Sequence, residues 1–312
     1  MLHLDMFDPQ ILAQNLINGA DSFPLLAVPF FMLAGEIMNV GGLSRRIVNL
    51  ALALVGHLRG GLGYVTILAA VMMAALSGSA VADTAALAAL LLPMMKRAGH
   101  DPARAGGLIA SAGIIAPVIP PSIGFVIFGV AANLSIGKLF IAGIVPGILL
   151  GVGIAVAWTI VAKKENITPP PKASSHERWH ALRSSTWALM LPVIVLVGLK
   201  MGVFTPTEAA VVAAVYAMFV AMFIYREMKW SQLAQVFVAA AKTTAVIMFL
   251  VAAAMVSAWL ITVANLPGKV IGLLQPFMDN PTLLLVAIML LCIAVGTAMD
   301  MTPTILILTP VL

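Results

Sequence analysis

The sequence predicts an all-α polytopic membrane protein, built as an inverted-topology repeat with re-entrant helical hairpins and broken helices. Of its 312 residues, 62% are hydrophobic and only 9% are charged, and the mean hydropathy is +1.09. Soluble domains usually carry about 25% charged residues. The composition therefore argues against soluble enzymes and, despite the net charge of +5, against nucleic-acid binders. The single cysteine, Cys292, excludes an intrachain disulfide.

Uninterrupted apolar runs predict the membrane spans, because a helix needs about 20 apolar residues to cross a bilayer. The runs are Phe23–Val40, Leu139–Ala162, Trp187–Phe204, Pro206–Tyr225 and Thr243–Ala264. Cap residues followed by proline predict helix starts. They are the capping box Thr205-Pro206-Thr207-Glu208 and the pairs Asp101-Pro102, Asn280-Pro281 and Thr302-Pro303. The amphipathic segment Ser44–His57 is expected to lie along the membrane surface.

Three further apolar stretches are interrupted. Leu62–Met95 is too long for one helix and is broken at Ser77-Gly78-Ser79. Thr282–Leu312 is broken at Gly296-Thr297 and again at Pro303. We expect these two stretches to be hairpins that enter and leave on one face. Gly106–Ala132 contains Pro117, Pro120 and Pro121, and is expected to be a broken helix that crosses once.

The basic residues support this topology, since short cytoplasmic loops are rich in lysine and arginine. With Leu62–Met95 as a hairpin, 14 of the 17 basic residues share one side. The other three are Lys138, Lys200 and Lys269. If the stretch instead crossed the membrane, Arg45, Arg46 and Arg59 would change sides and the bias would weaken. The hairpin is therefore favoured.

The order of elements repeats along the chain. Aligning Asp83 with Asp300 also brings Pro93 onto Pro310 and Leu33 onto Leu250. By span count the two hairpins open from opposite faces, as in inverted-repeat transporters. We expect a first repeat over residues 1–162, a cytoplasmic linker over 163–186 and a second repeat over 187–312, truncated within hairpin 282–312. Counterparts of Pro117–Pro121 would lie beyond Leu312, so a fragment of a longer protein is expected.

The interruptions also predict where solute and ion bind. Irregular backbone at membrane depth is tolerated only where it is buried in protein or lines a watery cavity. Its carbonyl and hydroxyl oxygens suit an alkali cation, and half-helix N-termini suit a carboxylate. Asp83 within the membrane would cost roughly 2.5–3.5 kcal/mol and is a candidate ligand. It could instead cap the second arm of its hairpin. Asp300 has the same two alternatives, with Thr302 the favoured cap there.

Other acidic groups have structural explanations. Glu36 lies near the cytoplasmic end of its span, where pairing with Arg45 or Arg46 is expected. Glu208 belongs to its capping box. No phosphate-binding loop or dinucleotide fingerprint is present, which argues against a nucleotide-driven pump.

Four segments carry a family resemblance. PFFMLAGEIMN (Pro29–Asn39), SGSAVADTAA (Ser77–Ala86), APVIPPSIGF (Ala116–Phe125) and TPTEAA (Thr205–Ala210) resemble the large membrane subunit of tripartite ATP-independent periplasmic (TRAP) transporters. Within that family the details are most similar to the branch that includes 2,3-diketo-L-gulonate permeases. The resemblance extends through the whole chain.

The resemblance implies a Na⁺-coupled, elevator-type importer of small organic acids in a bacterial inner membrane, with no organic cofactor. It implies two partners, a periplasmic solute-binding (P) protein and a small membrane (Q) subunit. Carried over, the substrate and ion site comprises Ser77, Gly78, Ser79, Asp83, Pro117, Pro120, Pro121, Ser122, Gly296, Thr297, Asp300 and Thr302. Na⁺ would bind backbone and hydroxyl oxygens near Ser77, Ser79, Gly296 and Thr297.

A different class that the sequence leaves open is an intramembrane aspartyl protease using Asp83 and Asp300. Such enzymes resemble one another in a Gly-x-Gly-Asp element, whereas Ala82 and Met299 precede the aspartates here. Hydroxyl neighbours at both breaks suit ion binding better, so transport is the favoured function.

Overall fold

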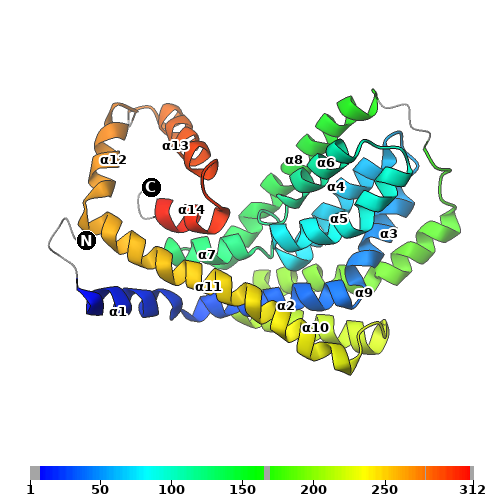
Figure 1. Ribbon diagram of the computed structural model, residues 1–312, viewed down its shortest axis with the longest axis horizontal. Helices are drawn as coiled ribbons and strands as arrows, with labels where there is room; N and C mark the ends of the chain where they lie inside the picture. The colour runs from blue at the N-terminus through cyan, green and yellow to red at the C-terminus, as the bar shows by residue number, and fades with distance from the viewer. Residues whose placement is uncertain (1–7, 165–168, 278, 310–312) are drawn as a thin grey trace. The chain divides into compact units, whose positions relative to one another are not determined.

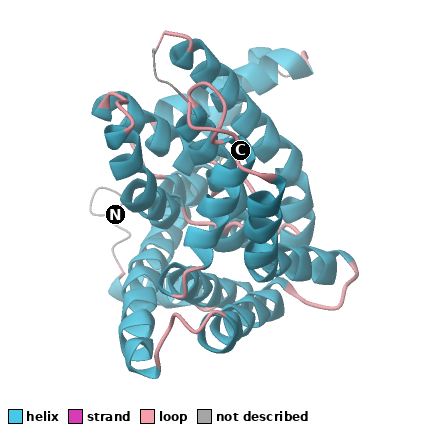
Figure 2. Cartoon of the chain, turned by 90° about the vertical axis from the view of Figure 1, so that its right-hand side faces the viewer, coloured by secondary structure: helices cyan, strands magenta, loops and turns pink. Residues whose placement is uncertain are grey.

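The computed structural model describes residues 8–164, 169–277 and 279–309, and these are helices joined by loops, with no strand among them (Figures 1 and 2). Within these ranges, five helical stretches are long and apolar enough to span a bilayer: Phe23–Val40, Ile136–Ala162, Ser175–Lys200, Pro206–Ile224 and Trp230–Val263. Each overlaps one of the five runs expected from the sequence, although Ser175–Lys200 begins before the run at Trp187 and Trp230–Val263 begins before the run at Thr243. The prediction of an all-helical polytopic membrane protein is confirmed.

The chain forms two compact units. The larger comprises Ala27–Phe125 and Ile136–Ala241, and the smaller comprises Met1–Leu26, Val126–Ser135 and Lys242–Leu312. Each unit contains segments of both expected repeats. The repeats were inferred from the order of elements along the chain, whereas the units are defined by compactness. The division into repeats over 1–162 and 187–312 therefore stays a prediction.

The larger unit packs short helices against long ones. Its helices are α2 (Ala27–Val40), α3 (Leu43–Val55), α4 (Gly61–Ser77), α5 (Ala80–Arg97), α6 (Pro102–Gly113), α8 (Ile136–Ala162), α9 (Ser175–Lys200) and α10 (Pro206–Phe219), which the π-helical turn Val220–Ile224 extends. Helix α4 contacts α3, α5, α6 and α8, while α2 packs along α10. Fully buried alanines of α2 and α10, among them Ala27, Ala34 and Ala209, allow this close approach.

The smaller unit contains α1 (Pro9–Ala20), the 3₁₀ turn Phe23–Leu26, α12 (Leu266–Leu274), the 3₁₀ turn Gln275–Phe277, α13 (Pro281–Gly296) and α14 (Met301–Leu308). Helices α7 (Ile123–Ala131) and α11 (Leu233–Val263, after the 3₁₀ turn Trp230–Gln232) each run from the larger unit into the smaller. Helix α1 packs on α11 where Gly19 faces Met255. A Cβ on Gly19 would lie 2.6 Å from the Met255 Cβ.

Capping side chains set several helix starts as predicted. Asp101 accepts the Arg104 N–H at 2.9 Å, Asn280 accepts the Thr282 N–H at 3.1 Å, and Thr205 forms its capping box with Glu208. Helix α9 begins at Ser175, well before the apolar run at Trp187, because Ser174 and Glu177 form a second capping box. The polar stretch 175–186 is thus helical.

Candidate functional site

The stretch Leu62–Met95 folds as a helical hairpin, as predicted. Helix α4 ends at Ser77, Gly78 takes a left-handed conformation (φ +61°), and α5 begins at Ala80. The Thr66 hydroxyl near the start of α4 lies 3.9 Å from the Met95 sulfur near the end of α5. The two arms therefore run antiparallel, with Gly78 at the tip.

Ser79 caps the second arm of the hairpin, and Asp83 does not. The Ser79 hydroxyl accepts the Ala82 N–H at 3.4 Å. Asp83 lies one turn later with only 2% of its surface exposed. Its Oδ1 accepts a hydrogen bond of 2.5 Å from the Ser77 hydroxyl, while no donor in the described part of the chain reaches its buried Oδ2. The carboxylate therefore keeps one oxygen without a partner, which is costly in a buried site.

The broken helix also forms as predicted. Helix α6 ends at Gly113, an irregular segment follows through Ser122, and α7 begins at Ile123. The Ser122 hydroxyl donates to the Pro117 carbonyl oxygen at 2.5 Å and accepts the Phe125 N–H at 3.3 Å. Ser122 is fully buried, so this hydroxyl fixes the turn from the irregular segment into α7.

The hairpin tip meets the irregular segment of the broken helix. A Cβ on Gly78 would lie 2.2 Å from the Pro121 carbonyl oxygen and 3.0 Å from the Ser122 Cα. The structure thus brings together Ser77, Gly78, Ser79 and Asp83 with Pro121 and Ser122, two elements that the sequence placed in one site. Pro120 joins Pro121 through a cis peptide bond.

Two contacts around the tip were not anticipated from the sequence. Gly35 of α2 faces Ser77, with its missing Cβ 3.4 Å from the Ser77 Cβ. Gly113 faces Thr84, whose Oγ1 would lie 1.7 Å from a Cβ at that position. A glycine inside an apolar helix is the one sequence signal that could have suggested these close approaches.

The second hairpin belongs to the smaller unit and has a different tip. Helix α13 ends at Gly296, and the Thr297 hydroxyl donates to the Ala294 carbonyl oxygen at 2.7 Å. Helix α14 begins at Met301, so Asp300 occupies the N-cap position, although its side chain makes no capping hydrogen bond to the described helix. The expectation that Thr302 is the cap is wrong, because Thr302 lies buried within the first turn.

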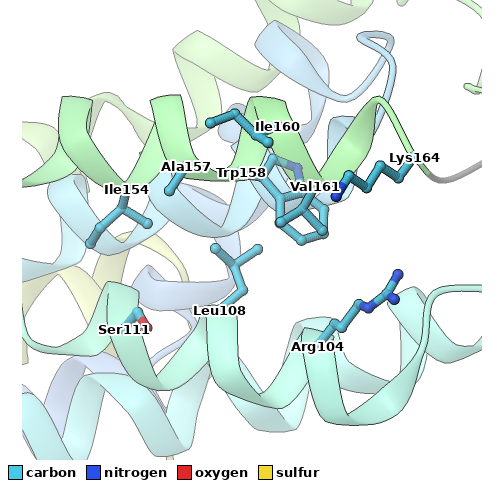
Figure 3. Close-up of a pocket in the computed structure, with 9 residues that line it drawn as sticks. All are labelled: Arg104, Leu108, Ser111, Ile154, Ala157, Trp158, Ile160, Val161 and Lys164. Carbon is cyan, nitrogen blue, oxygen red and sulfur yellow. The ribbon is translucent and has the colours of Figure 1, made fainter.

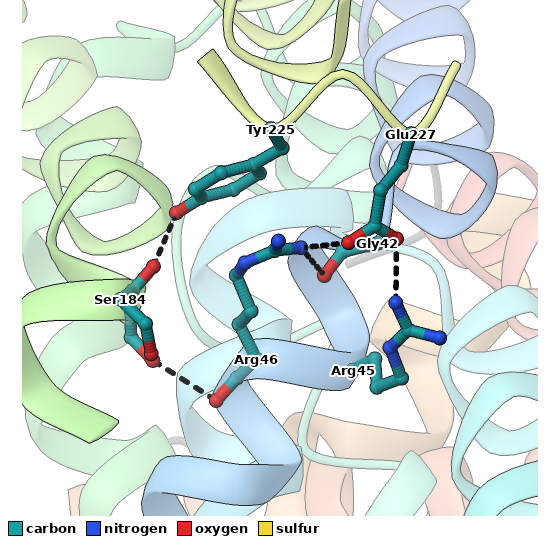
Figure 4. Close-up of polar contacts among 7 residues, drawn as sticks. Gly42, Arg45, Arg46, Ser184, Tyr225 and Glu227 are labelled. Atoms are coloured by element: carbon teal, nitrogen blue, oxygen red, sulfur yellow. Dashed lines mark hydrogen bonds and ion pairs between the residues drawn. The ribbon is translucent and has the colours of Figure 1, made fainter. Parts of the chain in front are cut away.

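The predicted partner of Glu36 is also wrong. Both Arg45 and Arg46 pair with Glu227, at 2.7 and 2.6 Å (Figure 4). Arg46 lies 3.7 Å above the ring of Tyr225, whose hydroxyl donates to the Ser184 carbonyl oxygen at 2.7 Å. These contacts join α3, α9 and the loop after α10. Glu36 instead lines a cavity of about 500 Å³ beside Asn39, Arg45 and the alanines of α5.

At the tip of the first hairpin, oxygen atoms that could bind a hard cation lie beside helix N-termini. Ser77, Ser79, Asp83 and the Pro121 carbonyl contribute oxygens, and the unpartnered Asp83 Oδ2 fits a cation. Helices α5 and α7 both start at this contact, and their first turns carry partial positive charge that suits an anion. Apolar spans combined with broken helices of this kind are typical of membrane transport proteins.

Sequence comparison identifies the family. The chain matches the model of the tripartite ATP-independent periplasmic transporter, DctM component, over residues 1–312, and it belongs to that family. It is 62% identical over its whole length to the 2,3-diketo-L-gulonate TRAP transporter large permease protein YiaN of Escherichia coli, covering 73% of that protein.

Two further relatives show the breadth of the family. The chain is 40% identical over 96% of its length to the C4-dicarboxylate TRAP transporter large permease protein DctM of Pseudomonas aeruginosa, covering 70% of that protein. It is 39% identical over 96% of its length to the sialic acid TRAP transporter large permease protein SiaM of Vibrio cholerae, again covering 70%.

Family membership settles the class of protein. The chain is a transporter component of the bacterial inner membrane and not an enzyme. The alternative of an intramembrane aspartyl protease is therefore not supported.

Proposed function

We propose that this chain is the membrane permease of a Na⁺-coupled importer of small organic acids, working by an elevator-type movement. The observation that carries the proposal is the contact between the hairpin tip at Gly78 and the broken helix at Pro121, beside a buried carboxylate with one unpartnered oxygen. Such a contact would provide ligands for a cation and for an anion in one place.

The cation would bind among oxygen atoms at the first tip. Asp83 Oδ2 is buried and has no hydrogen-bond donor within the described residues, so a cation would satisfy it. The Ser77 hydroxyl donates to Asp83 Oδ1 and accepts the Ser79 N–H at 3.2 Å, so its hydrogen is not available to a ligand. These features favour a small hard cation such as Na⁺.

The substrate carboxylate would bind where α5 and α7 begin. Both helices have N-terminal N–H groups near the tip, and helix N-termini attract anions. The solutes in the names of the three relatives, 2,3-diketo-L-gulonate, C4-dicarboxylate and sialic acid, all carry carboxylates. A small organic acid is thus the substrate class that the site chemistry and the relatives jointly support.

By the family resemblance, Gly296, Thr297, Asp300 and Thr302 of the second hairpin would also bind substrate and ion. In a tripartite system this permease would work with a small membrane subunit and a periplasmic solute-binding protein that delivers the acid. Membership of a tripartite transporter family supports two partners beside this permease.

Uptake in proteoliposomes tests the proposal. The full-length permease would be reconstituted with both partners, and uptake of the acid that binds the periplasmic receptor would be measured with Na⁺ or with choline outside. We expect uptake to require Na⁺. Equal uptake in choline would overturn the coupling, while no uptake of any carboxylate that the receptor binds would overturn the substrate class.

A further inference from the structure

A cavity of about 500 Å³ lies between α5 and the segment in which α2 leads into α3, within the larger unit. We call it the α2–α5 cavity. One wall contains Glu36, Asn39 and Arg45, and the other contains Ala82, Ala85, Ala86 and Ala89. The four alanines are spaced so that they share one face of α5. The cavity is far larger than the roughly 30 Å³ that one water molecule occupies in the liquid, so a hydrated ion fits inside it.

The α2–α5 cavity starts at the depth of the first hairpin tip. Gly35 faces Ser77 at the tip, and Glu36 follows Gly35 directly. On the opposite wall the lining of α5 runs from Ala82, next to Asp83, to Leu90. Eight residues of helix correspond to about 12 Å. The cavity therefore leads from the turn that holds Asp83 toward the basic end of α5, which the charge bias of the sequence assigns to the cytoplasm.

Of the two carboxylates that line this cavity, Glu227 is paired and Glu36 is not. Glu227 binds Arg45 at 2.7 Å and Arg46 at 2.6 Å (Figure 4). All 17 lysines and arginines of the chain lie in the described ranges, and none of them pairs with Glu36 there. Glu36 belongs to the span Phe23–Val40. Ionisable side chains within membrane spans commonly face a water-filled cavity and mark the pathway of an ion or substrate.

A second cavity of the larger unit provides a reference. This α6–α8 cavity measures about 440 Å³, and Leu108, Ala157 and Trp158 are among the side chains that line it (Figure 3). Its lining residues, all of them described, include no carboxylate, and none belongs to the hairpin of α4 and α5. A probe placed there reports on a cavity of similar size that lacks Glu36.

We propose that the α2–α5 cavity is a passage for a small cation between the first hairpin tip and the cytoplasm, and that Glu36 attracts the cation into it. The identity of the cation as Na⁺ rests on the proposed function. A carboxylate in a low-dielectric cleft raises the local concentration of cations and lowers that of anions. Glu36 would therefore lower the barrier for Na⁺ between the tip and the cytoplasm, and would oppose the re-entry of an organic acid from that side.

The reactivity of a single thiol tests the charge of the cavity without requiring transport. Cys292→Ser removes the native cysteine, and Ala86→Cys places a thiol in the α2–α5 cavity. The full-length permease with its partners, in sealed vesicles, would react with a cationic (trimethylammonium) or an anionic (sulfonate) methanethiosulfonate reagent added on the cytoplasmic side. Each rate would be divided by that of the same reagent with a free thiol in solution. We expect a preference of about tenfold for the cationic reagent.

Four further variants assign the preference to Glu36. Glu36→Gln should reduce it to within about twofold of none, and Glu36→Asp should retain it because the charge is kept. Glu208→Gln makes the same exchange outside the cavity, in a capping box that glutamine also forms, and should leave the preference unchanged. With Ala157→Cys as the probe in the α6–α8 cavity, Glu36→Gln should have no effect. Equal normalised rates, an undiminished preference in Glu36→Gln, or no reaction from the cytoplasmic side would overturn the proposal.

Uptake by Glu36→Gln separates this inference from the proposed function. The Na⁺-dependent rise in Tm should persist in this variant, because Asp83 and its bond from Ser77 are untouched. The rate of uptake at saturating external Na⁺ should fall severalfold, and an unchanged rate would overturn the role of Glu36 in Na⁺ release. Uptake by the parent protein that does not need Na⁺ would instead overturn the proposed coupling, while the thiol measurement would still decide whether the cavity attracts cations.

Discussion

Gly78 approaches Pro121 so closely that a Cβ at position 78 would lie 2.2 Å from the Pro121 carbonyl oxygen. Gly78 also holds φ at +61°, a conformation that other residues adopt at a cost of about 1–2 kcal/mol. Two independent constraints thus require glycine at the tip of the first hairpin. One constraint is the left-handed backbone at Gly78, and the other is its contact with the broken helix. A glycine that has only the first constraint can separate them experimentally.

Gly78→Ala should destabilise the protein by about 2–4 kcal/mol, combining backbone strain with overpacking. The matched control is Gly99→Ala, since Gly99 has φ +90° but, in the part of the chain that the structure describes, no atom beyond its chain neighbours lies within 4 Å of its missing Cβ. The control should cost only the strain. Unfolding of both variants in detergent would measure the difference, and equal losses would show that the contact with Pro121 is unimportant.

Asp83→Asn should weaken Na⁺ binding at least about tenfold, because a buried negative charge beside the cation is lost. The measurement is the Na⁺-dependent rise in Tm, compared with the same experiment in choline. Asp101→Asn is a suitable control, since Asp101 is a helix cap that accepts the Arg104 N–H. It should leave both the cap and the response to Na⁺ intact, because asparagine caps a helix about as well as aspartate. An undiminished Na⁺ response in Asp83→Asn would exclude the carboxylate as a ligand.

Glu227→Gln should destabilise the larger unit by about 1 kcal/mol, because it removes partners from two arginines at a partly exposed site. Arg46 should account for most of the loss, since its side chain is 20% exposed whereas that of Arg45 is 58% exposed. Double-mutant cycles of Glu227→Gln with Arg46→Gln and with Arg45→Gln would test this order. Both coupling energies should shrink at high salt. A larger coupling for Arg45 would contradict the prediction.

Gly63→Ala should destabilise the protein by about 1–3 kcal/mol, because the added methyl group would overlap the Trp158 ring. Gly153→Ala is the matched control within α8. Among the described residues, no atom outside the local helix backbone lies within 4 Å of the Gly153 Cβ position, so alanine there should be neutral or stabilising by up to about 1 kcal/mol. Unfolding curves of the two variants would decide the matter, and a neutral Gly63→Ala would mean that the ring can move.

The sequence was most informative where local chemistry decides the structure. The excess length of Leu62–Met95 and the glycine at position 78 predicted a bent hairpin, and the prolines at 117, 120 and 121 predicted the broken helix. Asp101 and Asn280 were identified as caps because the cap residue and the following proline act within one turn. At the start of α14 the same reasoning predicted Thr302 as the cap, whereas Asp300 occupies that position. Both are common capping residue types, and the sequence alone does not show which of them caps the helix.

Contacts between distant segments could not be predicted. Arg45 and Glu227 are separated by 182 positions, and the nearer Glu36 offered a simpler partner. The interruptions led us to expect one broken hairpin to face one broken helix, but they did not specify the contact of Gly78 with Pro121. The box Ser174 to Glu177 marks the start of α9 in the sequence, but the polar residues that follow it give no hydropathy signal for a helix.

The hydroxyl hydrogens of Ser77 and Ser122 both point inward, one to a carboxylate and the other to a backbone carbonyl. Neither hydroxyl can therefore donate a hydrogen bond to an incoming solute. Each serine oxygen can act only as an acceptor or as a cation ligand. A metal ion bound there would neutralise that negative potential. The neighbouring helix N-termini would then bind an acid more tightly. By thermodynamic linkage, the bound acid would raise the affinity for the ion by the same factor. We therefore expect the ion and the solute each to bind weakly alone and more tightly when both are present. Such cooperative binding is the condition for transporting both together.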